Sequence, residues 1–213
     1  MSMFGVNSYI VAAKNKNCVL IDAPEDNGAI LKAITEKGLK LKKILLTHGH
    51  CDHIASAAEI AEKTGAKVYI HSADLEKLFD GELNLTEYFG LPSILPVSEP
   101  VPVEDGDIIT QDELDFEVMN TPGHTRGSVC YILGDNMFCG DTLFKGSMGR
   151  TDMPDGDEDE MTKTLIMLYE FDPKTNYRLY PGHNAPSYME EERKSNAYMK
   201  YAYKHKDEYD NEM

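Results

Sequence analysis

The chain is poor in positive charge, with 21 Lys and Arg against 37 Asp and Glu, and its formal net charge is −16. A nucleic-acid-binding surface needs basic residues to neutralise phosphates, and an anionic membrane surface would repel so acidic a chain. The charge balance therefore argues against both nucleic acid and membrane as partners. It favours a small-molecule substrate, and it says nothing of the oligomeric state.

Long apolar runs and cysteine-rich segments are also missing. No apolar stretch approaches the roughly 18–20 residues of a membrane-spanning helix, and residues 1–14 lack the basic and apolar segments of a secretory signal. Four cysteines in 213 residues do not form a disulfide scaffold. We therefore expect a cytoplasmic protein. Because 41% of its residues are apolar, a single domain over residues 1–213 can bury a proper core.

Strand-like and helix-like segments alternate along the chain, which predicts an α/β layered fold. The expected strands are 3–6, 9–13, 18–21, 43–46, 67–70, 107–110, 114–120, 128–133, 136–139 and 176–180. The expected helices are 29–37, 54–63, one that begins at Ser72, one capped by Asp157 that runs to about Glu170, and one over 187 to about 206.

Residues 81–102 contain four prolines and predict an irregular loop. Long loops in compact domains are often functional, so we expect this one near the mouth of the site. A covering loop without a role in substrate binding is the alternative.

The segment 128–139 predicts a hairpin around a two-residue turn, Gly134-Asp135. In that register Leu133 pairs with Asn136, and Cys130 lies opposite Cys139 on one face of the sheet. We expect both thiols to be packed in the core and reduced.

Residues 47–53, Thr-His-Gly-His-Cys-Asp-His, carry three of the seven histidines. Imidazole nitrogen and carboxylate oxygen are ligands of zinc, iron and manganese. In extended backbone the side chains of His48 and His50 point the same way. Asp52 and His53 can then turn toward a second ion as the chain enters a helix. A histidine-rich surface loop is the alternative, and the density of the cluster argues against it.

Three later residues share one position in the local pattern, because each follows a glycine at the end of an expected strand: His124, Asp141 and His183. A strand end holds a side chain rigidly, and glycine lets the loop turn sharply around an ion. Together with the cluster they predict a two-metal site. One ion takes His48, His50 and His124, the other takes Asp52, His53 and His183, and Asp141 contacts both.

Cys51 stands inside the cluster, and a thiolate is a good zinc ligand. The neighbouring positions already supply full coordination, so we expect Cys51 to point away from the ions. His71, at a strand end, and His205, in solvent, are expected to have no part in the site.

Four motifs occur in a fixed order: residues 47–53, the Thr-Pro-Gly-His-Thr of 121–125, Gly140-Asp141, and the Pro-Gly-His of 181–183. This order resembles the metallo-β-lactamase superfamily, and the segment 140–152 is similar to the glyoxalase II-like hydrolases within it. The resemblance implies an αββα sandwich, two mixed sheets flanked by helices, with a dinuclear site at one edge. It implies the same seven ligands, with Asp141 as the bridge.

The implied reaction is hydrolysis of a thioester or related ester by a hydroxide that bridges two divalent ions. Zinc is the first expectation, and iron or manganese suit the same ligands. Asp141 and Asp52 are the expected catalytic carboxylates, Asp52 because a ligand in its place can also hydrogen-bond the hydroxide.

The resemblance is incomplete where glyoxalase II enzymes hold glutathione. About thirty residues follow His183, where the full-length enzymes carry a helical domain. The family's Lys-x-Tyr contact is replaced by Arg150-Thr-Asp152. Arg150 and Lys145 remain as candidate substrate contacts, but a glutathione thioester is not supported.

Two other hypotheses stay open. A persulfide dioxygenase of the same superfamily would use one iron ion at His48, His124 and Asp141. A non-catalytic metal-binding protein would keep the site without a reaction. A nuclease is disfavoured by the charge, and a secreted β-lactamase by the missing signal.

Overall fold

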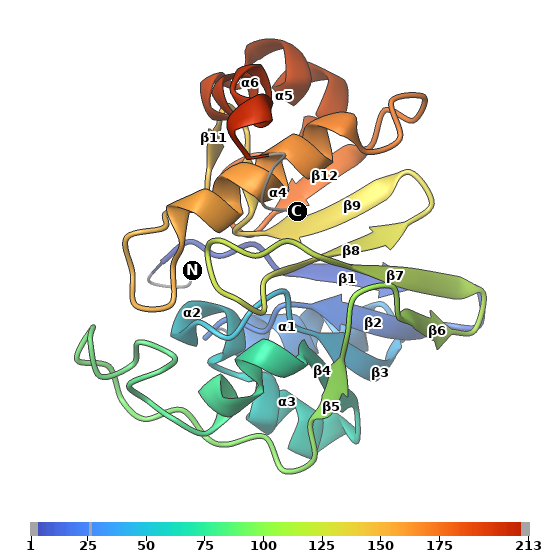
Figure 1. Cartoon of the computed structure of the whole chain (residues 1–213). Coiled ribbons are helices and arrows are strands. Elements are labelled where there is room, and N and C mark those ends of the chain that lie inside the picture. Colours follow the sequence, from blue (N-terminus) through green and yellow to red (C-terminus); the bar gives the residue numbers. More distant parts are fainter. Residues whose placement is uncertain (1–3, 26, 210–213) are drawn as a thin grey trace.

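The computed structural model describes residues 4–25 and 27–209. Two β-sheets face each other, and helices cover the outer face of each (Figure 1). This arrangement is the αββα sandwich expected from the sequence. Among the described residues, no helix has the length and apolar character needed to cross a membrane.

The first sheet comes from the N-terminal half of the chain, and all its strands except β1 run parallel. In spatial order its strands are β1 (Tyr9–Ala12), β2 (Asn17–Ile21), β3 (Lys40–Leu45), β4 (Lys67–His71) and β5 (Val101–Val103). The helical segments of this half are α1 (Asn27–Glu36), α2 (Cys51–Ile54), α3 (Ala57–Thr64) and the 3₁₀ helix η1 (Ser72–Leu78).

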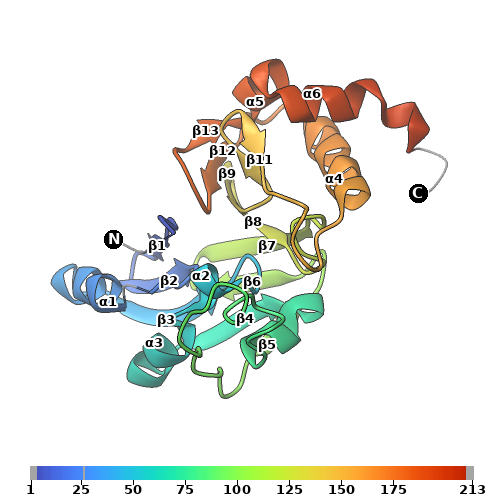
Figure 2. The same cartoon turned by 90° about the vertical axis from the view of Figure 1, so that its left-hand side faces the viewer.

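The second sheet is antiparallel except for the parallel pair β9–β12. In spatial order its strands are β13 (Ser187–Tyr188), β12 (Arg178–Pro181), β9 (Asn136–Gly140), β8 (Val129–Leu133), β7 (Leu114–Asn120) and β6 (Ile108–Gln111). A small hairpin, β10 (Leu143–Phe144) and β11 (Ser147–Met148), follows β9. The helices of this half are α4 (Glu158–Glu170), α5 (Met189–Ser195), α6 (Ala197–Lys204) and the 3₁₀ helix η2 (Lys206–Glu208), with α4 against α6 (Figure 2).

The apolar core has three layers because successive side chains of a strand point to opposite faces. On β2, Val19 and Ile21 pack between the two sheets, whereas Cys18 and Leu20 pack against α1 and α3. A third cluster joins the outer face of the second sheet to α4, α5 and α6. The two sheets therefore form one packed body whose strand ends meet at a common edge.

The hairpin of β8 and β9 has the expected register. Leu133 pairs with Asn136, and Tyr131 pairs with Phe138. Continued by one more residue pair, this register would place Cys130 opposite Cys139. Both are free thiols, fully buried in the same apolar cluster, so the prediction that both are packed in the core and reduced is confirmed.

Two expected helices are interrupted by side-chain hydrogen bonds. The helix expected over 54–63 starts earlier, as α2, and breaks before α3 where the Ser56 hydroxyl donates to the carbonyls of Ala23 and Pro24. The helix expected over 187–206 starts as a short strand and divides into α5 and α6. Asn196 causes this division because its side-chain oxygen caps α6, accepting from the amides of Tyr198 and Met199.

Other local expectations were wrong or incomplete. No strand forms over residues 4–6, and residue 3 lies outside the described residues. His71, rather than Ser72, caps η1 through its ring nitrogen. Asp157 caps α4 as expected. The loop expected over 81–102 is irregular until β5 begins.

Candidate metal centre

The seven candidate ligands lie at one edge of the sandwich, where strands of both sheets end. The loop after β3 and the start of α2 carry His48, His50, Asp52 and His53. His124 follows β7, Asp141 follows β9, and His183 follows β12. The structure therefore brings together residues that are separated by up to 135 positions in the chain, and they form two adjoining clusters.

Each cluster offers three ligand atoms within 4.8 Å of one another: His48, His50 and His124 in one, and Asp52, His53 and His183 in the other. Asp141 lies between them. Its carboxylate oxygens are 3.3 Å from His53 Nε2, 3.4 Å from His183 Nε2 and 3.7 Å from His124 Nε2. A carboxylate in this position would reach ions held by either cluster.

Three buried polar atoms of the site have no hydrogen-bond partner among the described residues: His48 Nε2, His50 Nε2 and Asp141 Oδ1. Buried polar atoms are almost always paired, because an unpaired one costs free energy. Burial lowers the pKa of His48 and His50 well below the ordinary value, and the neighbouring imidazoles lower it further. Both rings are therefore neutral at pH 7, the form that binds a metal.

In the cluster of Asp52, His53 and His183, the pKa values of the two histidines are raised instead of lowered. Burial alone would lower the pKa of His53, but the carboxylates of Asp141, Asp22 and Asp52 hold it well above its usual value. Burial likewise opposes the shift at His183, whose pKa is raised to about 9 by Asp141 and Asp52. A metal ion at this cluster would have to replace the protons on these rings, so its binding would release protons.

Asp22 is a supporting residue that the sequence reasoning missed. Its Oδ2 accepts hydrogen bonds from His53 Nδ1 and from the Thr47 hydroxyl, both at 2.9 Å, and its Oδ1 accepts from the Thr47 amide. The bond to Nδ1 directs His53 Nε2 toward Asp141, and such partners orient metal-binding imidazoles. The available signal was its place directly after β2, the parallel neighbour of β3.

Asp74 is a second missed residue, and it joins the two loops that carry His48, His50 and His124. It is fully buried on η1. Its Oδ2 accepts from the Gly49 amide at 2.7 Å and from the Thr125 hydroxyl at 2.8 Å, while its Oδ1 accepts from the Gly127 amide and pairs with Lys77. No local pattern in the sequence marks this role.

Gly182 provides space in front of Asp141. A Cβ atom at this position would collide with Asp141 Oδ1 and with His53 Cε1. The glycine before His183 therefore allows the end of β12 to approach the other ligands. The sequence predicted only that this glycine permits a sharp turn, whereas the structure shows that any side chain here would collide with the site.

A cavity of 180 Å³ opens over the clusters. His50, Asp52, His124, Asp141 and His183 line it, together with Leu85 and Phe89 of the long loop before β5. The expectation that the loop lies near the mouth of the site is thus confirmed.

The two candidate substrate contacts differ in position. Arg150 lines this cavity, but its guanidinium pairs with Asp152 through two hydrogen bonds of 2.7 and 2.8 Å, and its carbonyl accepts from His124 Nδ1. Lys145 is exposed on the β10–β11 turn and is not among the residues that line this cavity.

Cys51 lies away from both ligand clusters. It is buried against Leu85 and Met153, and burial raises the pKa of its thiol to about 11, so it carries no thiolate at pH 7. We expect the Cys51→Ser protein to keep its metal content and to turn over substrate within about threefold of the native rate, since the change is nearly isosteric. Elemental analysis and steady-state kinetics check this. A loss beyond a hundredfold with metal depletion would make Cys51 a ligand.

Comparison with known proteins shows the family to which the chain belongs. The family profile described as the metallo-beta-lactamase superfamily matches residues 2–183. The chain belongs to this superfamily. Hydroxyacylglutathione hydrolase GloC of Haemophilus influenzae is 29% identical over 204 residues, which cover 93% of this chain and 95% of that protein.

Two solved structures resemble the fold closely. The BLEG-1 B3 metallo-beta-lactamase has a TM-score of 0.85 at 27% identity and covers 93% of this chain and 96% of its own. TTHA1623, in a di-iron-bound form, has a TM-score of 0.83 at 30% identity, with coverage of 93% and 97%. This superfamily member is therefore a metallo-hydrolase in the broad sense, with a cluster of side chains that could hold a metal ion at the edge of the sandwich.

Proposed function

We propose that this protein is a dinuclear metal-dependent hydrolase that cleaves a small-molecule thioester or related ester. The observation that carries the proposal is the pair of three-ligand clusters joined by Asp141, whose carboxylate lies within 3.7 Å of histidines from both. The similarity to GloC supports thioesters as the first substrate class to test. The proposal includes a single domain over residues 1–213 that acts in the cytoplasm.

In this proposal His48, His50 and His124 hold one ion and Asp52, His53 and His183 hold the other. Zinc is the first candidate, and the mixed nitrogen and oxygen ligands also suit iron and manganese. Two such ions supply a nucleophile at neutral pH and polarise the carbonyl of the substrate. Asp141 would contact both ions. Burial opposes the ionisation of its carboxyl group, but His53 and His183 hold its pKa well below the usual value, so the group is a carboxylate at pH 7.

The residues around the ligands keep the geometry. Asp22 orients His53, the carbonyl of Arg150 orients His124, and Asp74 holds the loops on either side. Asp52 lines the open cavity and lies 3.4 Å from His183, so its second oxygen is available to accept a hydrogen bond from the attacking water. No serine or cysteine nucleophile is required.

Metal stoichiometry tests the proposal directly. Protein purified without chelator should contain close to two first-row metal ions per chain, because seven ligands exceed the needs of one tetrahedral ion. Elemental analysis measures this, and a thioester assay should show activity that chelation removes and metal restores. His205→Ala is the control, since this exposed histidine directly follows α6 and its ring donates to the carbonyl of Tyr201 on that helix.

The rival reaction gives a different result. A persulfide dioxygenase would hold one iron ion per chain, consume oxygen with a persulfide, and leave thioesters intact. Two bound ions with no turnover of thioester, ester or persulfide would instead favour a metal-binding protein without this chemistry.

A further inference from the structure

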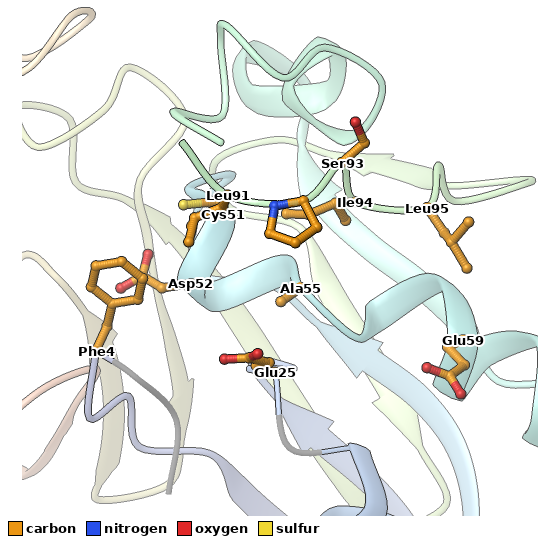
Figure 3. A pocket seen from close by; sticks show the side chains of 11 residues that line it. Phe4, Glu25, Cys51, Asp52, Ala55, Glu59, Leu91, Ser93, Ile94 and Leu95 are labelled. Atoms are coloured by element: carbon orange, nitrogen blue, oxygen red, sulfur yellow. The ribbon is translucent and has the colours of Figure 1, made fainter. Parts of the chain in front are cut away.

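A second cavity adjoins the metal centre, and it differs from the first in character. Its volume is 230 Å³, and Phe4 and Asp52 line both cavities. Figure 3 shows Phe4 and the Asp52 carboxylate at one end and Glu59 at the other, with the chain that carries Leu91, Ile94 and Leu95 facing Ala55 across the pocket. The second cavity therefore leads away from a candidate metal ligand.

The wall of this pocket is mostly apolar. Phe4, Ala55, Leu91, Ile94 and Leu95 supply carbon surface, and Cys51 lines the pocket beside them. Apolar surface attracts apolar ligand groups in proportion to the area removed from water. The volume lies below the range of about 300–1,000 Å³ usual for drug-sized ligands, so the pocket suits a short chain rather than a tripeptide.

The charges at the pocket are all negative. Glu25, Asp52 and Glu59 border it, and none of its lining residues is basic. Glu59 bonds to Asn27 and Lys63, whereas the carboxylate of Glu25 has no partner among the described side chains. Figure 3 shows Glu25 on the side of the pocket opposite the Leu91–Leu95 segment.

The cations beside the pocket are already paired. Lys63 pairs with Glu59 of the pocket wall, and Arg150, which lines the adjoining cavity, pairs with Asp152. A substrate carboxylate that entered the pocket would meet Glu25 without a free cation to bind it, which costs free energy through like-charge repulsion.

We propose that this pocket binds a short, uncharged, apolar acyl chain of the substrate, and that it excludes acyl chains with a terminal carboxylate. The assignment rests on the proposed thioester hydrolysis. The carbonyl carbon lies at Asp52, where the two cavities meet, and the chain extends along Ala55 and Ile94. The leaving thiol departs through the cavity over the histidines.

Matched thioesters of one small neutral thiol test the assignment on the metal-loaded native protein. The probes are S-acetyl-, S-hexanoyl- and S-adipoyl-N-acetylcysteamine, the last of which has a six-carbon chain that ends in a carboxylate. We expect kcat/KM for the hexanoyl ester to exceed that for the acetyl ester by roughly tenfold or more, since each buried methylene adds affinity. The adipoyl ester should fall at least roughly tenfold below the hexanoyl ester, because Glu25 repels its carboxylate.

Two variants locate the preference in the pocket. Ala55→Phe fills it, and Leu95→Asp places a charge on a side chain that is 60% exposed and so has little weight in folding. Each should bring the hexanoyl-to-acetyl ratio of kcat/KM toward one. Glu25→Gln should narrow the gap between hexanoyl and adipoyl esters by about threefold or more. Glu117→Gln, which removes an exposed carboxylate on β7, should leave both ratios unchanged.

The outcomes separate this assignment from the proposed function. Hydrolysis of all three esters at similar rates, or ratios that the pocket variants do not change, would overturn the acyl pocket and leave the hydrolase intact. If no thioester is cleaved by protein with both ions bound, the proposed function fails and the acyl pocket fails with it.

Discussion

The Asp141→Ala protein is expected to lose both metal ions and to lose turnover by roughly a thousandfold or more. That factor corresponds to about 4 kcal/mol of transition-state stabilisation, which the two proposed ions would supply. Among the described residues, Asp141 is the carboxylate that lies within 3.7 Å of histidines from both clusters, and its removal would leave the two proposed ions without an anion between them. Its Oδ1 is buried and lies 3.3 Å from His53 Nε2, and its Oδ2 lies 3.4 Å from His183 Nε2. Elemental analysis and thioester kinetics on the same sample measure the effect.

His183→Ala is the comparison. His183 is partly exposed, and its loss leaves Asp52 and His53 as ligands of the same ion, so metal content and activity should fall less than in Asp141→Ala. A melting curve of metal-free protein controls for misfolding. If Asp141→Ala loses only one ion, or is no worse than His183→Ala, the bridging role of Asp141 is wrong.

The Asp74→Ala protein should lose about 3–5 kcal/mol of unfolding free energy, the usual effect of removing one partner from a buried ion pair. Asp74 is fully buried, and Lys77, which pairs with it at 2.9 Å, is 4% exposed. The change also removes the acceptor of the Gly49 and Gly127 amides. The buried ammonium of Lys77 then keeps only Asp155 as a partner.

Urea denaturation in excess chelator measures this effect, because bound metal would add its own stabilisation to the native state. Glu76→Ala, on the exposed side of the same 3₁₀ helix, should change stability by no more than about 0.5 kcal/mol. The double variant Asp74→Ala/Lys77→Met should recover part of the loss, since no charge is left buried. A change below about 1 kcal/mol for Asp74→Ala would mean that the pair behaves like a surface salt bridge.

Asp74 is also expected to affect metal binding, because it contacts the two loops that carry His48, His50 and His124. Gly49 lies between His48 and His50, and the Thr125–Gly127 turn follows His124, so one carboxylate holds both loops. The Asp74→Ala protein should accordingly bind metal more weakly even where it remains folded, by the roughly 10–100-fold that supporting residues of metal sites contribute.

Local sequence was sufficient where the controlling interactions are short-range. The two-residue turn at Gly134-Asp135 determined the register of β8 and β9, and thus the position of Cys130 and Cys139. Asp157 caps α4 from three residues away. The alternation of His48 with His50 and the glycines before His124, Asp141 and His183 marked the candidate ligands, because strand ends and sharp turns leave a pattern in neighbouring residues.

Local sequence failed where a distant group decided the result. Ser56 broke one expected helix by bonding to the chain near α1, and Asn196 divided another by capping its second half. Both residues are compatible with a helix in isolation, so their effect could be read only from the hydrogen bonds they make in the folded chain.

By itself, the sequence determined the α/β layering and the set of candidate ligands, because these depend on periodicity and strand ends. The order of its short motifs carried the resemblance to the superfamily, and that resemblance implied the αββα sandwich. Only the tertiary structure decided which carboxylates support the site and what surrounds it. Asp22 and Asp74 act across 31 and 53 residues, and the apolar pocket combines Phe4, Ala55 and Leu95 from separate segments. Such contacts carry no signature in neighbouring residues, since they arise when burial brings distant parts of the chain together.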